Sequence, residues 1–137
     1  MMKALTLWQP FADAIACGLK KYETRSWSTK LARPDLFIGN HGIKLAIHSA
    51  VRPMSKEYQA LADKYGMENL SFGKIVAICD LTDCILITPE LIYNQTQTEL
   101  DFGDWRIGRY AWRLENIQKL DKPIPAKGQQ GLWNFEL

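Results

Sequence analysis

The sequence predicts an α+β fold, a small and partly open β-barrel with two or three peripheral helices. Short runs with strand-like alternation outnumber the helical patterns, and the helical patterns lie between the strands. No internal repeat or low-complexity tract occurs. The length of 137 residues, 47% hydrophobic and 23% charged, is that of one globular domain and excludes a disordered or collagen-like chain. We therefore expect residues 1–137 to form a single domain.

The first expected elements are a strand over residues 2–8 and a short helix that follows it. Gln9 and Pro10 open this helix, because a proline at the first helical position lacks only an N–H group that would be unpaired there. Gly18 ends the helix, since glycine readily adopts the left-handed conformation. The free N–H groups near Gln9 would favour an anion at the mouth of a cleft.

Residues 21–27 are expected to form the next strand. Period-two alternation places four side chains on one face, namely Lys21, Glu23, Arg25 and Trp27. Charged groups are costly to bury unpaired, so this face should line a polar cleft; an ordinary solvated face with cross-strand ion pairs is the alternative. Trp8 and Trp27 flank the segment and would stack on a base or on an arginine plane, although tryptophan is also a common core residue.

The middle of the chain adds a loop, a strand and a helix. Residues 28–42 are rich in turn-forming and charged residues and predict a long loop. Alternation over residues 43–49 predicts a strand. His48 shares the polar face of that strand and titrates near neutrality, so it is a candidate ligand-binding residue, with a structural role as the alternative. Residues 55–65 form an amphipathic helix with Ser55 as its N-cap.

The second half of the chain begins with its most hydrophobic run. Residues 73–87 predict either one bent strand or two strands joined at residues 81–83. A short helix over residues 88–94 is expected next, because a threonine and a proline stand at its start. The polar residues 95–103 are expected to be mobile. Residues 109–114 alternate as a strand.

The last part of the chain holds a candidate ligand loop. Residues 121–125 are too rich in proline for a central strand. Residues 127–131 form a glycine-bounded loop that leads into a final strand at residues 132–135. Gln129 and Gln130 lie between the two glycines, which permit close approach of the backbone to a ligand. A plain flexible connection is the equally favoured alternative.

The charge of the chain is unevenly distributed. The net charge is only +2, but residues 1–56 hold nine Lys or Arg against three acids, a net charge of +6. Residues 57–137 carry −4, and residues 75–105 contain six acids without one Lys or Arg. This asymmetry suits a phosphate-bearing ligand on the N-terminal side, although it also occurs in proteins that bind no nucleic acid.

The cysteines and histidines show no metal-site spacing. Cys17, Cys79 and Cys84 are an odd number without a close pair, and His41 and His48 have no partners at zinc-ligand spacing. We expect reduced thiols, no metal and no cofactor. Neither a signal-peptide pattern nor an apolar run of about 18 residues occurs. We therefore expect a soluble, cytoplasmic protein.

Nearly the whole chain carries motifs of a known domain family. They are Trp8-Gln9-Pro10, then Gly18, Lys20, Glu23 and Arg25 in a G-x-K-x-x-E-x-R pattern, then Ser26-Trp27, and the segments 46–49, 73–84 and 127–133. On these motifs the chain resembles ASCH domains of the PUA-like superfamily. It looks most similar to the branch represented by the transcription coactivator activating signal cointegrator 1. The resemblance implies a PUA-like barrel with helices at its rim.

The resemblance also implies a cleft in which Lys20 and Glu23 face a nucleotide-like ligand. PUA-like domains bind RNA or modified nucleosides, so the leading hypothesis is a nucleic-acid or nucleotide binding domain, with RNA, DNA or a nucleoside-like molecule as partner. In it, cations hold phosphate or a base carbonyl, a tryptophan stacks and the glutamine loop contacts a base edge. The candidate ligand-binding residues are Trp8, Gln9, Lys21, Arg25, Trp27, His48, Gln129 and Gln130.

Two alternatives stay open. The first is a hydrolase acting on N-acylated pyrimidine nucleosides or on RNA, which leaves open whether the chain is an enzyme. In it Glu23, or a second carboxylate from residues 99–104, with Glu99 as one choice, activates water, and Lys20 stabilises the oxyanion. The small amidohydrolases of the family have threonine where this chain has Glu23, so that hydroxyl role does not carry over. The second alternative is a protein-interaction module of a transcription or translation complex.

Overall fold

The strands of the protein form one sheet. The computed structural model describes residues 2–37 and 42–136, and its strands lie in the order β2-β5-β4-β3-β1-β6. The strands are β1 (Met2–Leu7), β2 (Tyr22–Arg25), β3 (Ile43–Ser49), β4 (Lys74–Leu86), β5 (Tyr110–Pro125) and β6 (Leu132–Phe135). The helices are α1 (Phe11–Ala16), α2 (Thr29–Ala32), the 3-10 turn η1 (Pro34–Phe37), α3 (Lys56–Lys64), α4 (Pro89–Tyr93) and α5 (Gln97–Asp101).

The sheet is mixed and open. β1 pairs in parallel with β3, whereas the other neighbouring strands pair antiparallel. β2 and β6 are the edges, and no pairing joins them within the described ranges. The predicted α+β class is therefore confirmed. The sheet is not closed, and the partly open PUA-like barrel remains a prediction.

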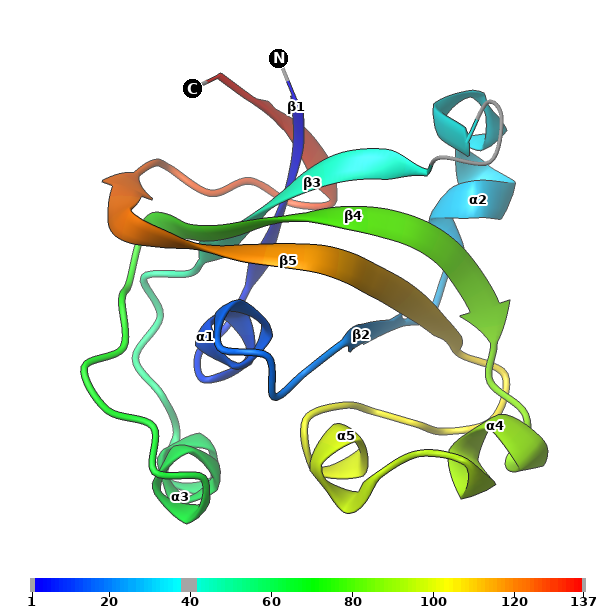
Figure 1. Cartoon of the computed structure of the whole chain (residues 1–137), viewed down its shortest axis with the longest axis horizontal. Helices are drawn as coiled ribbons and strands as arrows, with labels where there is room; N and C mark the ends of the chain where they lie inside the picture. Colours follow the sequence, from blue (N-terminus) through cyan, green and yellow to red (C-terminus); the bar gives the residue numbers. More distant parts are fainter. Residues whose placement is uncertain (1, 38–41, 137) are drawn as a thin grey trace.

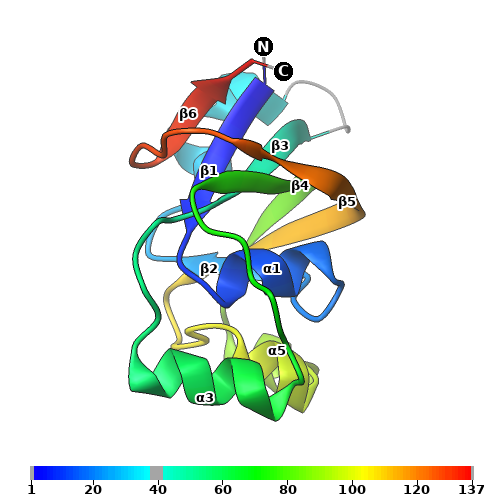
Figure 2. The same ribbon diagram turned by 90° about the vertical axis from the view of Figure 1, so that its left-hand side faces the viewer.

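The elements are stacked along one direction. β4 and β5 run side by side across the middle of the molecule, with α1 and β2 on one side of them (Figure 1). Farther out on that side, α3, α4 and α5 form an outer row of helices, which the turned view of Figure 2 shows again beyond α1. This arrangement brings β2 and α1 between the sheet and the outer helices.

The long strands differ in part from the prediction. Residues 74–86 form the single strand β4 with register shifts against β5, one of them between Leu81 and Asp83, which confirms the bent-strand alternative. Residues 121–125 end β5, with Ile124 opposite Ile75 of β4, but no strand within the described residues pairs with their other side, which agrees with their exclusion from a central strand. β2 pairs only with the beginning of β5, so the later prolines lie where β5 has β4 as its one partner.

The helices were predicted incompletely. α1, α3 and α4 confirm three expected helices, although Pro10 is the N-cap of α1 and not its first residue. α2 lies inside the expected loop, where the Ser28 hydroxyl accepts a hydrogen bond from the Leu31 N–H group. α5 lies in the segment expected to be mobile; Thr96 caps it and Phe102 directly after it is fully buried. The part of the expected loop at residues 38–41 lies outside the described residues.

The main core lies between the sheet and α1. Leu5, Leu45 and Leu81 of three strands pack there with Ile15 of α1 and with Trp112 of β5, all of them buried. A second cluster surrounds Trp133 and Phe135 of β6. Among the described helices, none has the length and apolar character needed to cross a membrane.

Candidate functional site

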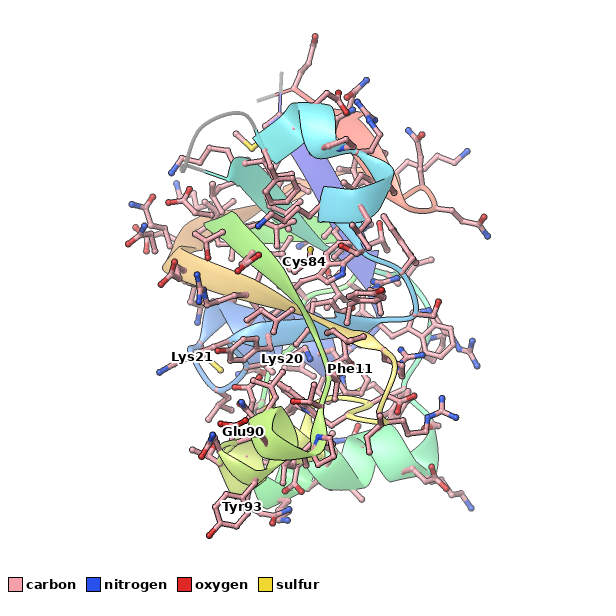
Figure 3. All side chains as sticks on the ribbon, turned by 90° about the vertical axis from the view of Figure 1, so that its right-hand side faces the viewer. Phe11, Lys20, Lys21, Cys84, Glu90 and Tyr93 are labelled. Carbon is pink, nitrogen blue, oxygen red and sulfur yellow. The ribbon has the colours of Figure 1, made fainter. Side chains whose placement is uncertain are left out.

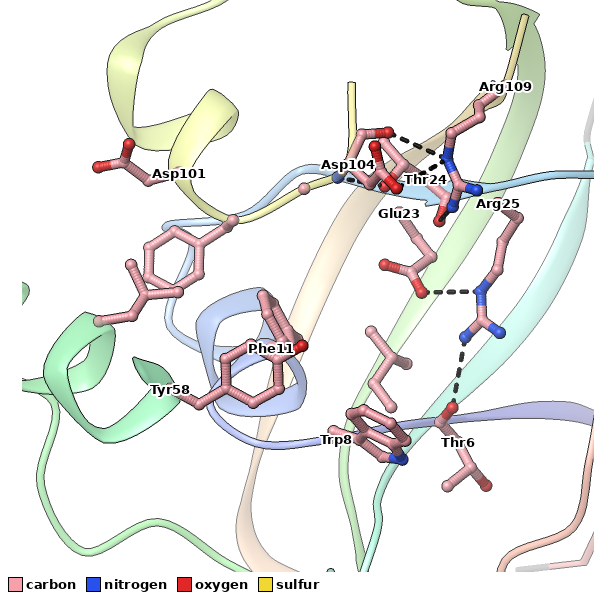
Figure 4. Close-up of a pocket in the computed structure, with 14 residues that line it drawn as sticks. Thr6, Trp8, Phe11, Glu23, Thr24, Arg25, Tyr58, Asp101, Asp104 and Arg109 are labelled. Carbon is pink, nitrogen blue, oxygen red and sulfur yellow. Dashed lines mark hydrogen bonds and ion pairs between the residues drawn. The ribbon is translucent and has the colours of Figure 1, made fainter. Parts of the chain in front are cut away.

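A cleft of about 580 Å³ opens where β1, β2, α1 and α3 meet the connection from α5 to β5. Figure 4 shows aromatic side chains on one side of it, with Asp101 beyond them, and the other charged side chains on the opposite side. The aromatic side consists of Trp8, Phe11, Tyr58 and Phe102. The polar side consists of Glu23, Thr24, Arg25, Asp104 and Arg109. Five separate segments of the chain therefore build one concave surface.

Glu23 lies between two cations. Its Oε1 atom is 3.3 Å from the Lys20 ammonium, and its Oε2 atom accepts a 2.8 Å hydrogen bond from Arg25 Nε. Lys20 is buried, with 1% of its surface exposed, and its ammonium also donates to the Phe102 carbonyl. The turn that follows α1 brings Lys20 there, because its backbone N–H group donates to the Ala14 carbonyl. The Glu23 carboxylate thus lies at the cleft wall, and the buried Lys20 ammonium lies behind it.

Arg25 and Arg109 are the two cations of the cleft wall. Arg25 Nη2 donates to the Thr6 carbonyl at 3.4 Å, which ties β2 to β1. Arg109 donates to the carbonyls of Asp104 and Thr24 at 3.2 and 3.3 Å. A hydrogen bond from Arg106, followed by the charge of Arg109, lowers the pKa of the Asp104 carboxyl below its usual value. Hydrogen bonds along both wall arginines fix where their remaining N–H groups point.

The aromatic side is a set of tilted and edge-on rings. Phe11 meets Tyr58 of α3 edge to face, with 5.0 Å between the ring centroids, and Trp8 lies 6.3 Å from the same tyrosine. Trp8 is 44% exposed although it is among the largest side chains of the protein. The tryptophan therefore presents apolar surface at the edge of the cleft.

Comparison with known proteins decides the family. The sequence matches the model of the ASCH domain over residues 5–124, which is most of the chain. The chain belongs to the ASCH domain family. The family assignment made from the G-x-K-x-x-E-x-R motif is therefore confirmed. No curated protein matches the sequence significantly.

Solved structures share the fold of this ASCH domain. The crystal structure of ASCH from Zymomonas mobilis matches with a TM-score of 0.60 and 16% identity, over 98% of this chain and 87% of that one. A point mutant of the Zymomonas mobilis protein matches with a TM-score of 0.56 and 14% identity, over 98% of this chain and 89% of that one. At this identity the likeness concerns the fold.

The predicted site residues of the ASCH domain divide into two groups. Trp8, Glu23 and Arg25 line the cleft, and Lys20 lies directly behind Glu23. Figure 3 shows Lys20 inside the molecule and Lys21 at its outer edge. The remaining candidates do not line the cleft, namely Gln9, Lys21, Trp27, His48, Gln129 and Gln130. What any of these residues binds stays a prediction.

Gln9 and Trp27, two of the candidates outside the cleft, make hydrogen bonds inside the protein. The buried Gln9 side chain donates to the Ser71 carbonyl at 2.6 Å and accepts from the Asp13 N–H group at 3.0 Å. The Trp27 ring packs edge to face on Trp112, 4.8 Å between centroids, and the Trp27 carbonyl accepts from the indole of Trp112. The contacts of Gln9 join the start of α1 to the segment between α3 and β4, and those of Trp27 join the residues after β2 to β5.

His48 is held in one tautomer. Its Nε2 atom lies 2.7 Å from the Ala126 carbonyl, which only accepts, so Nε2 carries the hydrogen. Nδ1 then accepts from the Thr6 hydroxyl at 3.1 Å, and that hydroxyl accepts from the Trp133 indole at 3.0 Å. Desolvation by burial lowers the pKa of His48, against a smaller opposing effect of the Ala126 carbonyl. The geometry is that of a structural histidine.

The segment 99–104, expected to supply a second carboxylate, contributes Asp101 and Asp104 to the cleft wall but not Glu99. Glu99 is 5% exposed, and its carboxylate accepts the backbone N–H groups of Lys21 and Tyr22 at 3.0 to 3.1 Å. It therefore positions the start of β2, while Asp101 and Asp104 line the cleft. Arg109 lies 85 residues from its partner Thr24 of β2 along the chain, and no local motif pointed to it.

The described residues offer no cluster of three metal-ligating side chains. The cysteines Cys17, Cys79 and Cys84 are free thiols. Burial, the largest cause, raises the pKa of the Cys79 thiol to about 12. Thiolates are the reactive form of cysteine, so Cys79 is chemically inert at neutral pH.

Proposed function

We propose that this ASCH domain binds single-stranded nucleic acid, RNA in the first place, by taking one nucleotide unit into the cleft. One observation carries the proposal: an aromatic wall faces the Arg25–Glu23 pair across a concavity of about 580 Å³. Ligand pockets of about 300–1,000 Å³ are typical for small organic groups. A base needs an apolar face and a polar edge, and this cleft offers a partner for each.

The aromatic wall suits a base better than a purely polar ligand. Trp8 is exposed at the edge of the cleft, and Phe11 and Tyr58 continue the apolar surface inward. Stacking of an unpaired base on an aromatic side chain contributes about 1–3 kcal/mol and tolerates any base. Bases within a duplex are not available for such stacking, so the cleft favours single strands.

The polar wall combines acceptors and donors. Glu23 offers carboxylate oxygens, which accept from the amino and imino groups of base edges. Arg25 uses Nε for Glu23 and Nη2 for Thr6, and among the described residues Nη1 has no acceptor. That group remains available for a base carbonyl or a phosphate. The net charge of +6 in residues 1–56, which include Arg25, adds long-range attraction for a polyanion.

A binding assay with a matched aromatic control tests the proposal. The polarisation of fluorescently labelled RNA and DNA oligonucleotides, single-stranded and duplex, is measured against the natural chain, Trp8→Ala and Tyr93→Ala. Tyr93 is 88% exposed on α4 and does not line the cleft (Figure 3). We expect single strands to bind, Trp8→Ala to weaken binding about tenfold, and Tyr93→Ala to bind normally. Equal loss in both variants, or no binding by the natural chain, refutes the proposal.

A hydrolase is the second candidate, favoured by the Lys20–Glu23 pair at the cleft wall. In that case Glu23 activates water, while Lys20, turned toward Glu23 and the Phe102 carbonyl, holds the carboxylate in place. Arg25 is then better placed than Lys20 to stabilise an oxyanion, because it lines the cleft. Release of acid from N-acylated pyrimidine nucleosides, or cleavage of RNA, that is lost in Glu23→Gln would establish this function.

A protein-interaction role finds less support. Its favouring feature would be a contiguous apolar surface patch formed by exposed large apolar side chains, which among the described residues are Trp8, Leu31, Val51, Phe72, Leu86, Tyr93 and Ile107. We propose further, from the sequence resemblance, that the open sheet corresponds to a PUA-like barrel, that the chain is one domain, and that it acts in the cytoplasm.

A further inference from the structure

Arg52 lies at the edge of the cleft and was not singled out by the sequence. It belongs to the connection between β3 and α3, is exposed, and lies over the indole ring of Trp8. Its guanidinium carbon is 3.9 Å from the centroid of that ring. Trp8 in turn lines the cleft. The guanidinium therefore lies beside the entrance to the proposed nucleotide site.

Arg52 differs from the other arginines in its pairing. Each of the other five lies within 4.0 Å of a carboxylate, in the pairs Arg25–Glu23, Arg33–Asp35, Arg106–Asp104, Arg109–Asp104 and Arg113–Glu115. For Arg52, no such partner exists among the residues that the structure describes. Its positive charge is not neutralised by a neighbouring acid.

A stacked guanidinium is well suited to bind a phosphate. Stacking on Trp8 uses the face of the guanidinium plane, whereas its N–H groups point outward within that plane. The ring limits the orientations of the long side chain, so less rotational freedom is lost when an anion binds. Arg52 thus combines an oriented edge of donors with an unpaired charge next to the cleft.

We propose that Arg52 binds a backbone phosphate of a single-stranded nucleic acid, next to the nucleotide that occupies the cleft, with Trp8 as its platform. This inference rests on the proposed function and deepens it, because it assigns a second contact outside the cleft. A single nucleoside would not reach Arg52 through a phosphate. The site therefore prefers an oligonucleotide to a free nucleoside.

The salt dependence of binding tests this contact. Affinity for a single-stranded RNA of about ten nucleotides is measured over a range of salt concentrations for the natural chain, Arg52→Ala, Arg52→Lys and Arg33→Ala. Arg33 is an exposed arginine outside the cleft and serves as the matched control. A single lost phosphate contact flattens the plot of log K against log salt by about 0.7. We expect that change in Arg52→Ala and neither in Arg52→Lys nor in Arg33→Ala.

The two substitutions at Arg52 separate charge from shape. Arg52→Lys keeps the charge and hence the slope, but it should weaken binding severalfold because an ammonium has no planar donor edge. A wild-type slope in Arg52→Ala, or a flattened slope in Arg52→Lys, overturns the role of Arg52 and leaves the proposed function intact. If the natural chain binds no single-stranded nucleic acid, both proposals fail.

Discussion

At the scale of single residues, the buried charge of Lys20 makes Glu23 a stability determinant as well as a cleft residue. Lys20 is fully buried, and Glu23 is its charged partner at 3.3 Å. Glu23→Gln leaves that ammonium without a counter-charge, which costs about 3 kcal/mol in comparable buried pairs. We expect a loss of that size in the free energy of unfolding, measured with chemical denaturant.

A double variant tests whether the loss of stability comes from the unpaired ammonium of Lys20. In Lys20→Met/Glu23→Gln neither buried charge remains, so most of the loss should be recovered. If Glu23→Gln unfolds with the same free energy as the natural chain, Lys20 is not held by Glu23 and the description of the charged wall is wrong.

His48 gives a second prediction at this scale, in the pH dependence of stability. Its pKa is lowered from the ordinary value of 6.5 by burial. The unfolded imidazole therefore takes up a proton at a pH where the folded one stays neutral. The stabilisation is complete above about pH 6.5 and is lost as the pH falls through the lower pKa of the folded state.

The measurement compares unfolding free energies of the natural chain and of His48→Asn between pH 7.5 and pH 5. We expect a decline toward acid that is smaller in the variant, because the variant lacks the imidazole whose pKa is lowered by folding. Equal declines would mean that folding does not lower the pKa of His48.

The residues that could be predicted from the sequence are those close together in it. Alternation in the strand expected over residues 21–27 placed Glu23 and Arg25 on one face, and the family resemblance added Lys20. The structure joins these three charges at one site. Arg109 escaped prediction because its partner Thr24 is 85 residues away. The internal hydrogen bonds of Gln9 and His48 were not predicted either, because their partners Ser71 and Ala126 are also remote in sequence.

At the scale of elements, the outer helices depend on a few polar contacts. Asp101 at the end of α5 accepts hydrogen bonds from Lys64, Tyr65 and Gln97, and these lower the pKa of its carboxyl to about 2. The polar composition of residues 95–103 predicted a mobile segment, because composition does not show that Asp101 accepts hydrogen bonds from Lys64 and Tyr65. The burial of Phe102 and these hydrogen bonds decide its structure.

Removal of one tether should loosen α3. Tyr65→Phe deletes the hydroxyl that donates to Asp101 but keeps the ring against Phe102. We expect faster amide hydrogen exchange in α3 and α5 and unchanged exchange in the sheet. Tyr93→Phe, at an exposed position of α4, is the control. Exchange in α3 that stays at the natural rate would show that the tether does not hold the helix.

The same tether should respond to acid in a defined direction. Because the pKa of Asp101 is lowered from 3.8 to about 2, its contribution is present above pH 3.8 and is lost as the pH falls through about 2. Tyr65→Phe should therefore begin to lose the tether at a higher pH than the natural chain.

At the scale of the whole molecule, the cleft is a product of topology. β1, near the N-terminus, pairs with β6 near the C-terminus, and β2 is held at the far edge by β5. The α+β class followed from local patterns, whereas the parallel pairing of β1 with β3 and the open edges required long-range contacts that no local pattern encodes. Only the family resemblance, through the motif residues Trp8, Glu23 and Arg25, indicated that the end of the first strand and the second strand belong to one site.

The central claim is that the cleft of this ASCH domain binds a nucleotide unit of a single strand. The most direct measurement is the affinity of Arg25→Ala for single-stranded RNA at two salt concentrations, beside Arg33→Ala. Arg33 pairs with a carboxylate two residues away, as Arg25 does, but lies outside the cleft. We predict binding about tenfold weaker and less salt-dependent for Arg25→Ala, with Arg33→Ala unchanged. Natural affinity and natural salt dependence in Arg25→Ala would contradict the claim.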